Sequence, residues 1–261
     1  MKLNIKILGC GPSGGVPLIG GDKGQGVWGN CNPDNEKNFR FRSSIYIRSD
    51  LVSFLIDAGP DLRSQVLKGN ICKVDAILYT HEHADHIMGI DDLRGICRLN
   101  RAALPIFGPV ETVSYLKSKF DYCFEPLKDP NKIFRPHLEA NNVTESFSIK
   151  ELPVVPFDVN HGSVKTMGYR IGDFAYAPDF KTIPDASLDL LNGVKVCLFD
   201  GFQHKEHFTH AHIDYTVGIV NKIGAERGVL TNLGIDLDYD ALKSYLPAHI
   251  EPAYDGMEIQ L

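Results

Sequence analysis

The sequence lacks the long apolar run that a membrane-spanning helix or a secretory signal needs. No stretch approaches about 20 consecutive apolar residues, the length of a membrane span. The first residues, from Met1 to Ile7, include polar side chains where a signal peptide would hold an apolar run. We therefore expect a cytoplasmic protein without a membrane partner.

Closely spaced cysteines and basic runs are also missing. No two of the six cysteines lie within four residues of each other, which excludes a Cys-x-x-Cys zinc knuckle or redox pair, and we expect reduced, mostly buried thiols. The formal net charge is −6 and no run of Lys and Arg occurs, so the footprint of a protein that binds long nucleic acid is absent. A small anionic substrate stays compatible if metal ions dominate the local field. A monomer and a homodimer both remain open.

The 261 residues, of which 43% are hydrophobic and 23% charged, suit a soluble globular chain. The pattern predicts two packed sheets with helices outside, in one domain over 1–261. A glycine-rich loop at 9–15 follows the first strand but lacks the Lys-Ser/Thr ending of a P-loop. We expect strands at 3–8, 44–48, 51–57, 76–80, 147–159, 167–177, 194–200 and 228–231, helices at 61–68, 110–120, 214–223 and 238–245, and loops at 18–38 and 125–142.

Four potential metal ligands, His81, His83, Asp85 and His86, occur within six residues directly after an apolar strand. Imidazole and carboxylate ligands suit Zn²⁺, Fe²⁺ or Mn²⁺, and the absence of cysteine among them favours a catalytic over a structural site. His81 and His83 point one way from an extended segment, whereas Asp85 and His86 lie past the turn, so two adjacent metals are expected. The competing interpretation is a polar surface loop that happens to hold three histidines.

Further ligands must come from elsewhere in the chain. His161 and Asp179 each follow a predicted strand and are the two candidates. For either residue alone, a capping or turn position is the competing interpretation.

The order His-x-His-x-Asp-His, then His161, then Asp179, resembles the signature of the metallo-β-lactamase superfamily. The segments 8–11, 55–59, 80–86 and 254–259 extend the resemblance over most of the chain. Their combination is similar to the branch that contains the phosphoribosyl cyclic phosphate phosphodiesterase of phosphonate breakdown and the tRNA 3′-processing endonucleases. The resemblance implies an α+β fold, a four-layer αββα sandwich with metals at one edge between the sheets.

The resemblance also implies the ligand set of two divalent metal ions, Zn or Mn. One ion would be held by His81, His83 and His161, and the other by Asp85 and His86, with Asp179 bridging them. Asp57 matches an aspartate that supports such a site by hydrogen bonding rather than by binding metal.

A catalytic histidine is implied by the branch pattern His-x-x-Leu/Ile before a helix. His210 is in register with this pattern, and His212 is the fallback. An imidazole there could donate a proton to the leaving alkoxide, while Asp85 would orient the nucleophile. His204 and His207 are expected to lie in a solvated histidine-rich loop.

The sequence departs from the family pattern at two places. After the strand at 228–231 the family usually has a histidine that completes the second ligand set, but this chain has Asn232. An amide oxygen is a weaker ligand for a borderline-soft ion, so the second metal would bind less tightly or be more oxygen-loving. Asp236 and Asp238 could compensate, although Asp238 also suits a helix N-cap. The segment 28–33 holds one cysteine, Cys31, where the phosphonate enzyme has a cysteine cluster, so the extra structural zinc of that enzyme is expected to be absent.

These observations predict a metal-dependent phosphodiesterase that hydrolyses a small, linear or cyclic, nucleotide-like or phosphoribosyl phosphodiester with a metal-activated water. The first alternative is a tRNA 3′-processing type of ribonuclease, which the acidic balance and the lack of a long basic insertion disfavour. The second is a catalytically weak protein that binds a phosphorylated ligand, suggested by Asn232. Arg94 could reach a substrate phosphate, or could pair with its acidic neighbours.

Overall fold

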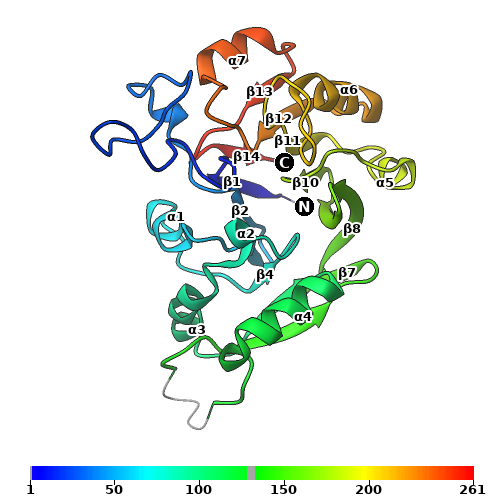
Figure 1. Cartoon of the computed structure of the whole chain (residues 1–261). Coiled ribbons are helices and arrows are strands. Elements are labelled where there is room, and N and C mark those ends of the chain that lie inside the picture. Colours follow the sequence, from blue (N-terminus) through cyan, green and yellow to red (C-terminus); the bar gives the residue numbers. More distant parts are fainter. Residues whose placement is uncertain (1, 128–132) are drawn as a thin grey trace.

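Two seven-stranded sheets face one another, and helices cover the outer face of each (Figure 1). The computed structural model describes residues 2–127 and 133–261. The first sheet has the order β14-β1-β2-β3-β4-β5-β6, and the second has the order β13-β12-β11-β10-β9-β8-β7. The strands of the first sheet are β1 (Asn4–Gly9), β2 (Ser44–Arg48), β3 (Ser53–Ile56), β4 (Ala76–Leu78), β5 (Leu104–Gly108), β6 (Leu138–Asn142) and β14 (Glu258–Gln260). Those of the second are β7 (Phe147–Ile149), β8 (Leu152–His161), β9 (Val164–Ile171), β10 (Phe174–Ala177), β11 (Val196–Asp200), β12 (Arg227–Thr231) and β13 (Ile250–Pro252).

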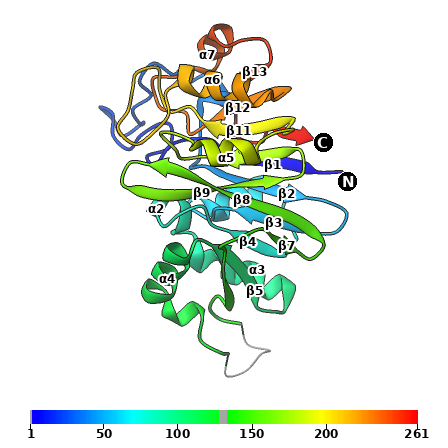
Figure 2. The ribbon, with the colours of Figure 1, turned by 90° about the vertical axis from the view of Figure 1, so that its right-hand side faces the viewer.

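The helices divide between the two sheets. Figure 2 shows α3 and α4 at one end of the molecule and α6 and α7 at the other. The helices are α1 (Leu62–Lys68), α2 (Ala84–Ile87), α3 (Leu93–Asn100), α4 (Val110–Lys119), α5 (Asp185–Leu190), α6 (Ile213–Ile223) and α7 (Tyr239–Tyr245). None of the helices in the described ranges is both long and apolar enough to cross a membrane.

Three hydrophobic clusters produce the four layers. The central cluster joins the inner faces of both sheets, with Phe54 from the first sheet and Leu198 from the second. A second cluster packs α5, α6 and α7 on the back of the second sheet, and a third packs the first four helices on the back of the first sheet. Strand side chains therefore alternate between an inner and an outer apolar layer. The predicted α+β sandwich in a single domain is confirmed.

The direction of the parallel strands determines at which edge of each sheet a site can form. β3, β4, β5 and β6 run parallel to one another in the first sheet, and β10, β11, β12 and β13 do so in the second. The carboxyl ends of parallel strands share one edge of a sheet, where the following loops converge. The predicted hairpin at 44–57 is also present, because β2 pairs with β3 in antiparallel register.

The prediction of a loop over 125–142 is wrong at its end. Residues 128–132 lie outside the described residues, but Leu138–Asn142 forms β6, an edge strand that pairs in parallel with β5. The sequence Leu-Glu-Ala-Asn-Asn does not predict a strand, because most of its side chains are polar. Backbone pairing with β5 determines the structure of this segment.

The loop at 18–38 is tied to the second sheet by the buried Arg40. Its guanidinium donates hydrogen bonds to the carbonyl oxygens of Leu233 at 3.2 Å, Gly234 at 3.0 Å and Leu237 at 2.6 Å. These carbonyls lie just beyond the end of β12, so the N-terminal loop is fixed against the edge where the parallel strands end. All six cysteines are free, and five of them are buried.

Candidate metal centre

The predicted site residues gather where strands of both sheets end. Asp57 follows β3 and His81 follows β4 in the first sheet. In the second sheet His161 is the last residue of β8, Asp179 follows β10, and Asn232 follows β12. Glycine is required at one point of this edge, because a Cβ on Gly59 would lie 1.9 Å from the carbonyl oxygen of Asp85.

One group of side chains joins His81 and His83 from the first sheet with His161 and Asp179 from the second. One potential ligand atom from each residue lies within 4.8 Å of all the others. His81 Nε2 is 2.9 Å from His83 Nδ1, and the Nε2 atoms of His81 and His161 are each 3.8 Å from Asp179 Oδ2. Three nitrogens and one oxygen thus converge from both halves of the sandwich.

A second group joins Asp85, His86 and Asp179. His86 Nε2 is 3.3 Å from Asp85 Oδ2 and 3.4 Å from Asp179 Oδ1. Asp179 therefore belongs to both groups, with Oδ2 toward the first and Oδ1 toward the second. The carboxylate of Asp179 lies where it could bridge two ions.

Asp57 fixes the orientation of two histidine rings. His86 Nδ1 donates to Asp57 Oδ2 at 2.7 Å, which leaves Nε2 as the free nitrogen. The Thr80 hydroxyl donates to Asp57 at 2.9 Å and can accept from His81 Nδ1 at 3.0 Å. Nδ1 of both rings is thus engaged, so Nε2 is the nitrogen that each ring turns toward Asp179 and would offer to a metal ion. Asp57 itself adopts a left-handed conformation with a φ of 66°.

The contacts of His161 and His86 indicate whether these side chains could bind a metal ion. His161 Nδ1 donates to the carbonyl oxygen of Thr209 at 2.9 Å, so its Nε2 is also free to bind. His86 Nε2 is buried and has no hydrogen-bond partner in the described part of the chain. An orphaned buried nitrogen is costly unless another group satisfies it. Imidazole nitrogens and carboxylate oxygens at these positions fit a divalent cation.

The pKa shifts of the site histidines also fit a bound cation. Burial lowers the pKa of His81 well below its ordinary value, so this ring is neutral. Burial also opposes a charge on His86, but the carboxylates of Asp179, Asp85 and Asp57 outweigh it and raise the pKa of His86 well above its ordinary value. Three carboxylates therefore create a small volume in which positive charge is favoured.

Asn232 lies between the second group and the predicted catalytic histidine. Its Nδ2 atom is 3.3 Å from Asp179 Oδ1, 3.4 Å from Asp200 Oδ1 and 3.0 Å from His210 Nδ1. In this arrangement the amide nitrogen faces Asp179 and donates to it. Asn232 also has a positive φ of 60°, a conformation that asparagine tolerates better than most residues.

His210 is held by a buried aspartate that the sequence analysis did not single out. His210 Nδ1 donates to Asp200 Oδ2 at 2.8 Å, and the His210 ring centroid is 4.6 Å from that of His161. Burial opposes a charge on His210, but the Asp200 carboxylate outweighs it and raises the pKa of His210 to about 9. Burial raises the pKa of Asp200 to about 7. The available signal was an aspartate at the end of an apolar strand, as at Asp179.

The other histidines of this segment have different surroundings. His212 is the N-cap of α6, and its Nδ1 accepts from the Tyr215 backbone at 3.4 Å. His207 Nδ1 accepts from the Thr209 backbone at 3.3 Å, and exposed His204 contacts the Tyr245 ring. The geometry therefore places His210, rather than the fallback His212, beside the candidate ligands.

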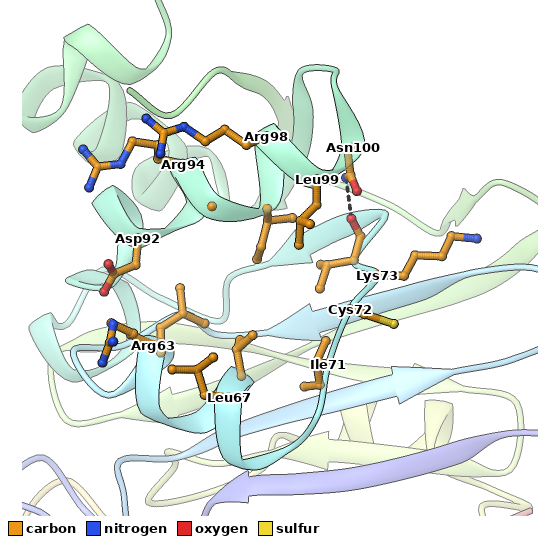
Figure 3. A pocket seen from close by; sticks show the side chains of 15 residues that line it. Arg63, Leu67, Ile71, Cys72, Lys73, Asp92, Arg94, Arg98, Leu99 and Asn100 are labelled. Atoms are coloured by element: carbon orange, nitrogen blue, oxygen red, sulfur yellow. Dashed lines mark hydrogen bonds between the residues drawn. The ribbon is translucent and has the colours of Figure 1, made fainter. Parts of the chain in front are cut away.

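Other candidates from the sequence lie away from this centre. Asp238 caps α7 by accepting from the backbone of Asp240 and Ala241. Neither Asp236 nor Asp238 belongs to the two groups of potential ligands found in the described residues. Arg94 Nη2 is 3.9 Å from Asp91 Oδ2, and Arg94 lines a separate groove between α1 and α3 (Figure 3).

The αββα sandwich and the clustered His and Asp side chains define a metal-dependent hydrolase. The model of the beta-lactamase superfamily domain matches residues 53–231. The chain belongs to the metallo-β-lactamase superfamily.

Proteins of the branch expected from the sequence are among those similar to this chain. A crystal structure of a diphosphatase from the PhnP family superposes with a TM-score of 0.89 and 35% identity over 100% of this chain and 98% of that chain. An octanoyltransferase of Porphyromonas gingivalis is 32% identical over 97% of this chain and 50% of its own length. A ribonuclease Z of Prochlorococcus marinus is 29% identical over 59% of this chain and 54% of its own length. The chain thus spans about half the length of these two relatives.

Proposed function

We propose that the site holds two divalent metal ions, Zn²⁺ or Mn²⁺. One would be bound by His81, His83 and His161, and the other by Asp85 and His86. Asp179 would contribute an oxygen to each, and Asn232 would add a weaker contact to the second ion if its amide turned to present the oxygen. The support is the use of separate Asp179 oxygens in the two groups of candidate ligands. Bound ions would lower the pKa of a coordinated water and neutralise phosphoryl oxygens.

We propose further that the reaction is hydrolysis of a small nucleotide-like or phosphoribosyl phosphodiester, linear or cyclic. The observation that carries this proposal is the Asp200–His210 pair beside the ligand cluster. Cleavage of a phosphodiester releases an alkoxide, which needs a proton that this imidazole can supply. The similarity to a PhnP-family diphosphatase over the whole chain also favours phosphate ester or anhydride chemistry.

The protein side chains have distinct roles in this mechanism. The Asp85 side chain is 14% exposed, and its carboxylate can accept a hydrogen bond from the attacking water and orient it. Asp200 holds the His210 ring through Nδ1 and stabilises its protonated form, so Nε2 can donate to the departing oxygen. Asp57 engages Nδ1 of His86 directly and Nδ1 of His81 through Thr80, so each ring would offer Nε2 to an ion.

Two alternatives use the same site. The ribonuclease Z relatives favour cleavage of an RNA, whereas the net charge of −6 favours a small substrate over tRNA. Asn232, which faces Asp179 with its amide nitrogen, is the feature that favours a binding protein without turnover. We do not extend octanoyl transfer to this chain, because the chain matches half of the relative with that name. The cytoplasmic location stays a prediction of the sequence, with which a monomer and a homodimer are equally compatible.

The test measures the metal content of one protein preparation and compares its hydrolysis of several substrate classes. Metal content is measured by elemental analysis, and hydrolysis of bis(p-nitrophenyl) phosphate is followed with and without added Mn²⁺ or Zn²⁺, for wild type and Asp179→Ala. We expect metal-dependent diesterase activity that is lost in Asp179→Ala. A monoester, a thioester, a β-lactam and a precursor tRNA are assayed in parallel. Faster turnover of any of these, or no turnover with metal bound, would overturn the proposal.

A further inference from the structure

A groove of about 400 Å³ lies between α1 and α3, away from the candidate metal centre. Figure 3 shows it with Leu67 of α1 on one side and Leu99 of α3 on the other. Its volume falls in the usual range of about 300–1,000 Å³ for small-molecule sites. None of the candidate metal ligands lines it.

The floor of this groove is aliphatic. Leu62, Val74 and Ile96 are buried beneath it, whereas Leu67 and Leu99 are 60% and 67% exposed. Two leucines on separate helices thus leave large apolar surfaces uncovered on opposite sides of one depression. Covering both with an apolar occupant would be favourable. The lining holds no aromatic residue or histidine, so a base or other flat ring would find no stacking partner.

The rim of the groove is basic, although the whole chain is acidic. Arg63, Lys73, Arg94 and Arg98 line it, against the single carboxylate of Asp92. The complete chain has 33 acidic and 27 basic residues, so this balance is local. In Figure 3 the three arginines lie toward one end of the groove and Lys73 toward the other.

Existing contacts leave much of this charge available. Arg94 is 3.9 Å from Asp91, and Lys73 is 3.8 Å from Asp75, both at the limit of an ion pair. Arg98 donates through Nε to the carbonyl oxygen of Ile133, which leaves its two terminal nitrogens unused by that bond. Guanidinium groups bind carboxylates well because two parallel hydrogen bonds can form.

We propose that this groove binds a medium-chain aliphatic carboxylate, with the carboxylate at the arginine end and the tail across Leu67 and Leu99. The charge of the rim requires an anionic head, and the floor requires an aliphatic tail. This inference is independent of the proposed phosphodiesterase activity, because it uses none of the residues assigned to that activity.

The test separates the head from the tail of the ligand. Binding of sodium decanoate to the full chain, below its micelle concentration, is followed through the backbone amide NMR signals of Gly95 and Asn100. Acetate has the head without the tail, and the decylammonium ion has the tail with the opposite charge. We expect saturable binding of one decanoate. Binding of each control compound should be at least about ten-fold weaker, because acetate loses the burial of the apolar tail and decylammonium loses the charged hydrogen bonds.

Variants locate the site. Leu99→Asn and Arg94→Gln change surface residues and should each weaken decanoate binding at least about five-fold, because each removes one of the contacts that confer affinity. Leu190→Asn, which changes a leucine that is 43% exposed on α5, should leave it unchanged. A chelator-treated sample shows whether the carboxylate binds metal instead. Equal binding of decanoate and decylammonium, insensitivity to both groove variants, or loss of binding on chelation would each overturn the proposal.

Discussion

His210 Nδ1 donates a 2.8 Å hydrogen bond to Asp200, a carboxylate that is fully buried at the end of β11. Because Nδ1 of His210 carries the proton toward Asp200, Nε2 is the nitrogen that can contact a substrate. His212, two residues later, instead caps α6.

The first prediction follows from this difference. Replacing the imidazole in His210→Asn should lower kcat for a phosphodiester with an alkoxide leaving group by about 10²–10⁴-fold with little change in KM, because proton donation to the leaving group is lost. His212→Asn is the matched control, since asparagine also caps a helix, and its kcat should stay near that of wild type. Steady-state kinetics decide, and a loss confined to His212→Asn would assign the proton donor to His212.

Asp57→Asn should weaken metal binding without changing a ligand. The amide can accept from only one side of its group, so His86 Nδ1 and Thr80 lose part of the support they now have from the carboxylate. Loss of such an outer contact typically lowers metal affinity or activity by about 10–100-fold. Competition with a chromophoric chelator measures the affinity, and urea unfolding of the metal-free variant controls for folding. Wild-type affinity in a folded variant would contradict the role given to Asp57.

Asn232→His should increase the metal content of the second group. The substitution replaces an amide that donates to Asp179 with an imidazole that can bind a borderline-soft ion. We expect two zinc ions per chain at concentrations where wild type holds fewer, as measured by elemental analysis after dialysis. Asn232→Ala removes the donor without adding a ligand and should show no such gain. Equal gains in both variants would mean that the amide only hinders the metal.

The stability of the fold should depend on Asp75 in a defined pH range. Burial opposes ionisation of Asp75, but hydrogen bonds from Lys150 and the Ser53 backbone outweigh it, so the pKa of Asp75 is lowered from 3.8. The unfolded chain takes up a proton first as the pH falls. The stabilisation is therefore complete above about pH 4–5 and is lost as the pH falls through the lower folded-state pKa.

Asp75→Asn should accordingly reduce the free energy of unfolding by about 1–2 kcal/mol at pH 7, because charged hydrogen bonds are lost. The difference from wild type should shrink toward pH 3. Asp173→Asn, which removes an exposed ion pair with Lys195, is the control and should have little effect. Urea titrations at several pH values measure both variants. A difference for Asp75→Asn that does not change with pH would show that packing, not charge, is responsible.

The sequence predicts the ligand positions better than it predicts their surroundings. His81, His161 and Asp179 could be identified because each follows an apolar strand, and strand ends of this fold converge on one edge. Asp200 occupies the same kind of position, but an aspartate before glycine also reads as an ordinary turn. Its contact with His210 exists only after β11 is placed between β10 and β12.

The groove could not be predicted for a related reason. Leu67 and Leu99 are 32 positions apart, and each alone is an unremarkable exposed leucine. Only the packing of α1 and α3 on the same sheet brings them to one depression. The polar strand β6 shows the same limit, since its pairing with β5 depends on the backbone rather than on its side chains.

The candidate ligands come from both sheets, which has a consequence for synthesis of the chain. His81, His83, Asp85 and His86 leave the ribosome first, and Asp179 follows about a hundred residues later. Until then the nascent chain presents an incomplete ligand set, with free imidazoles but without the shared carboxylate. The proposed ligand set is therefore complete only after the second sheet has been synthesised and has docked against the first.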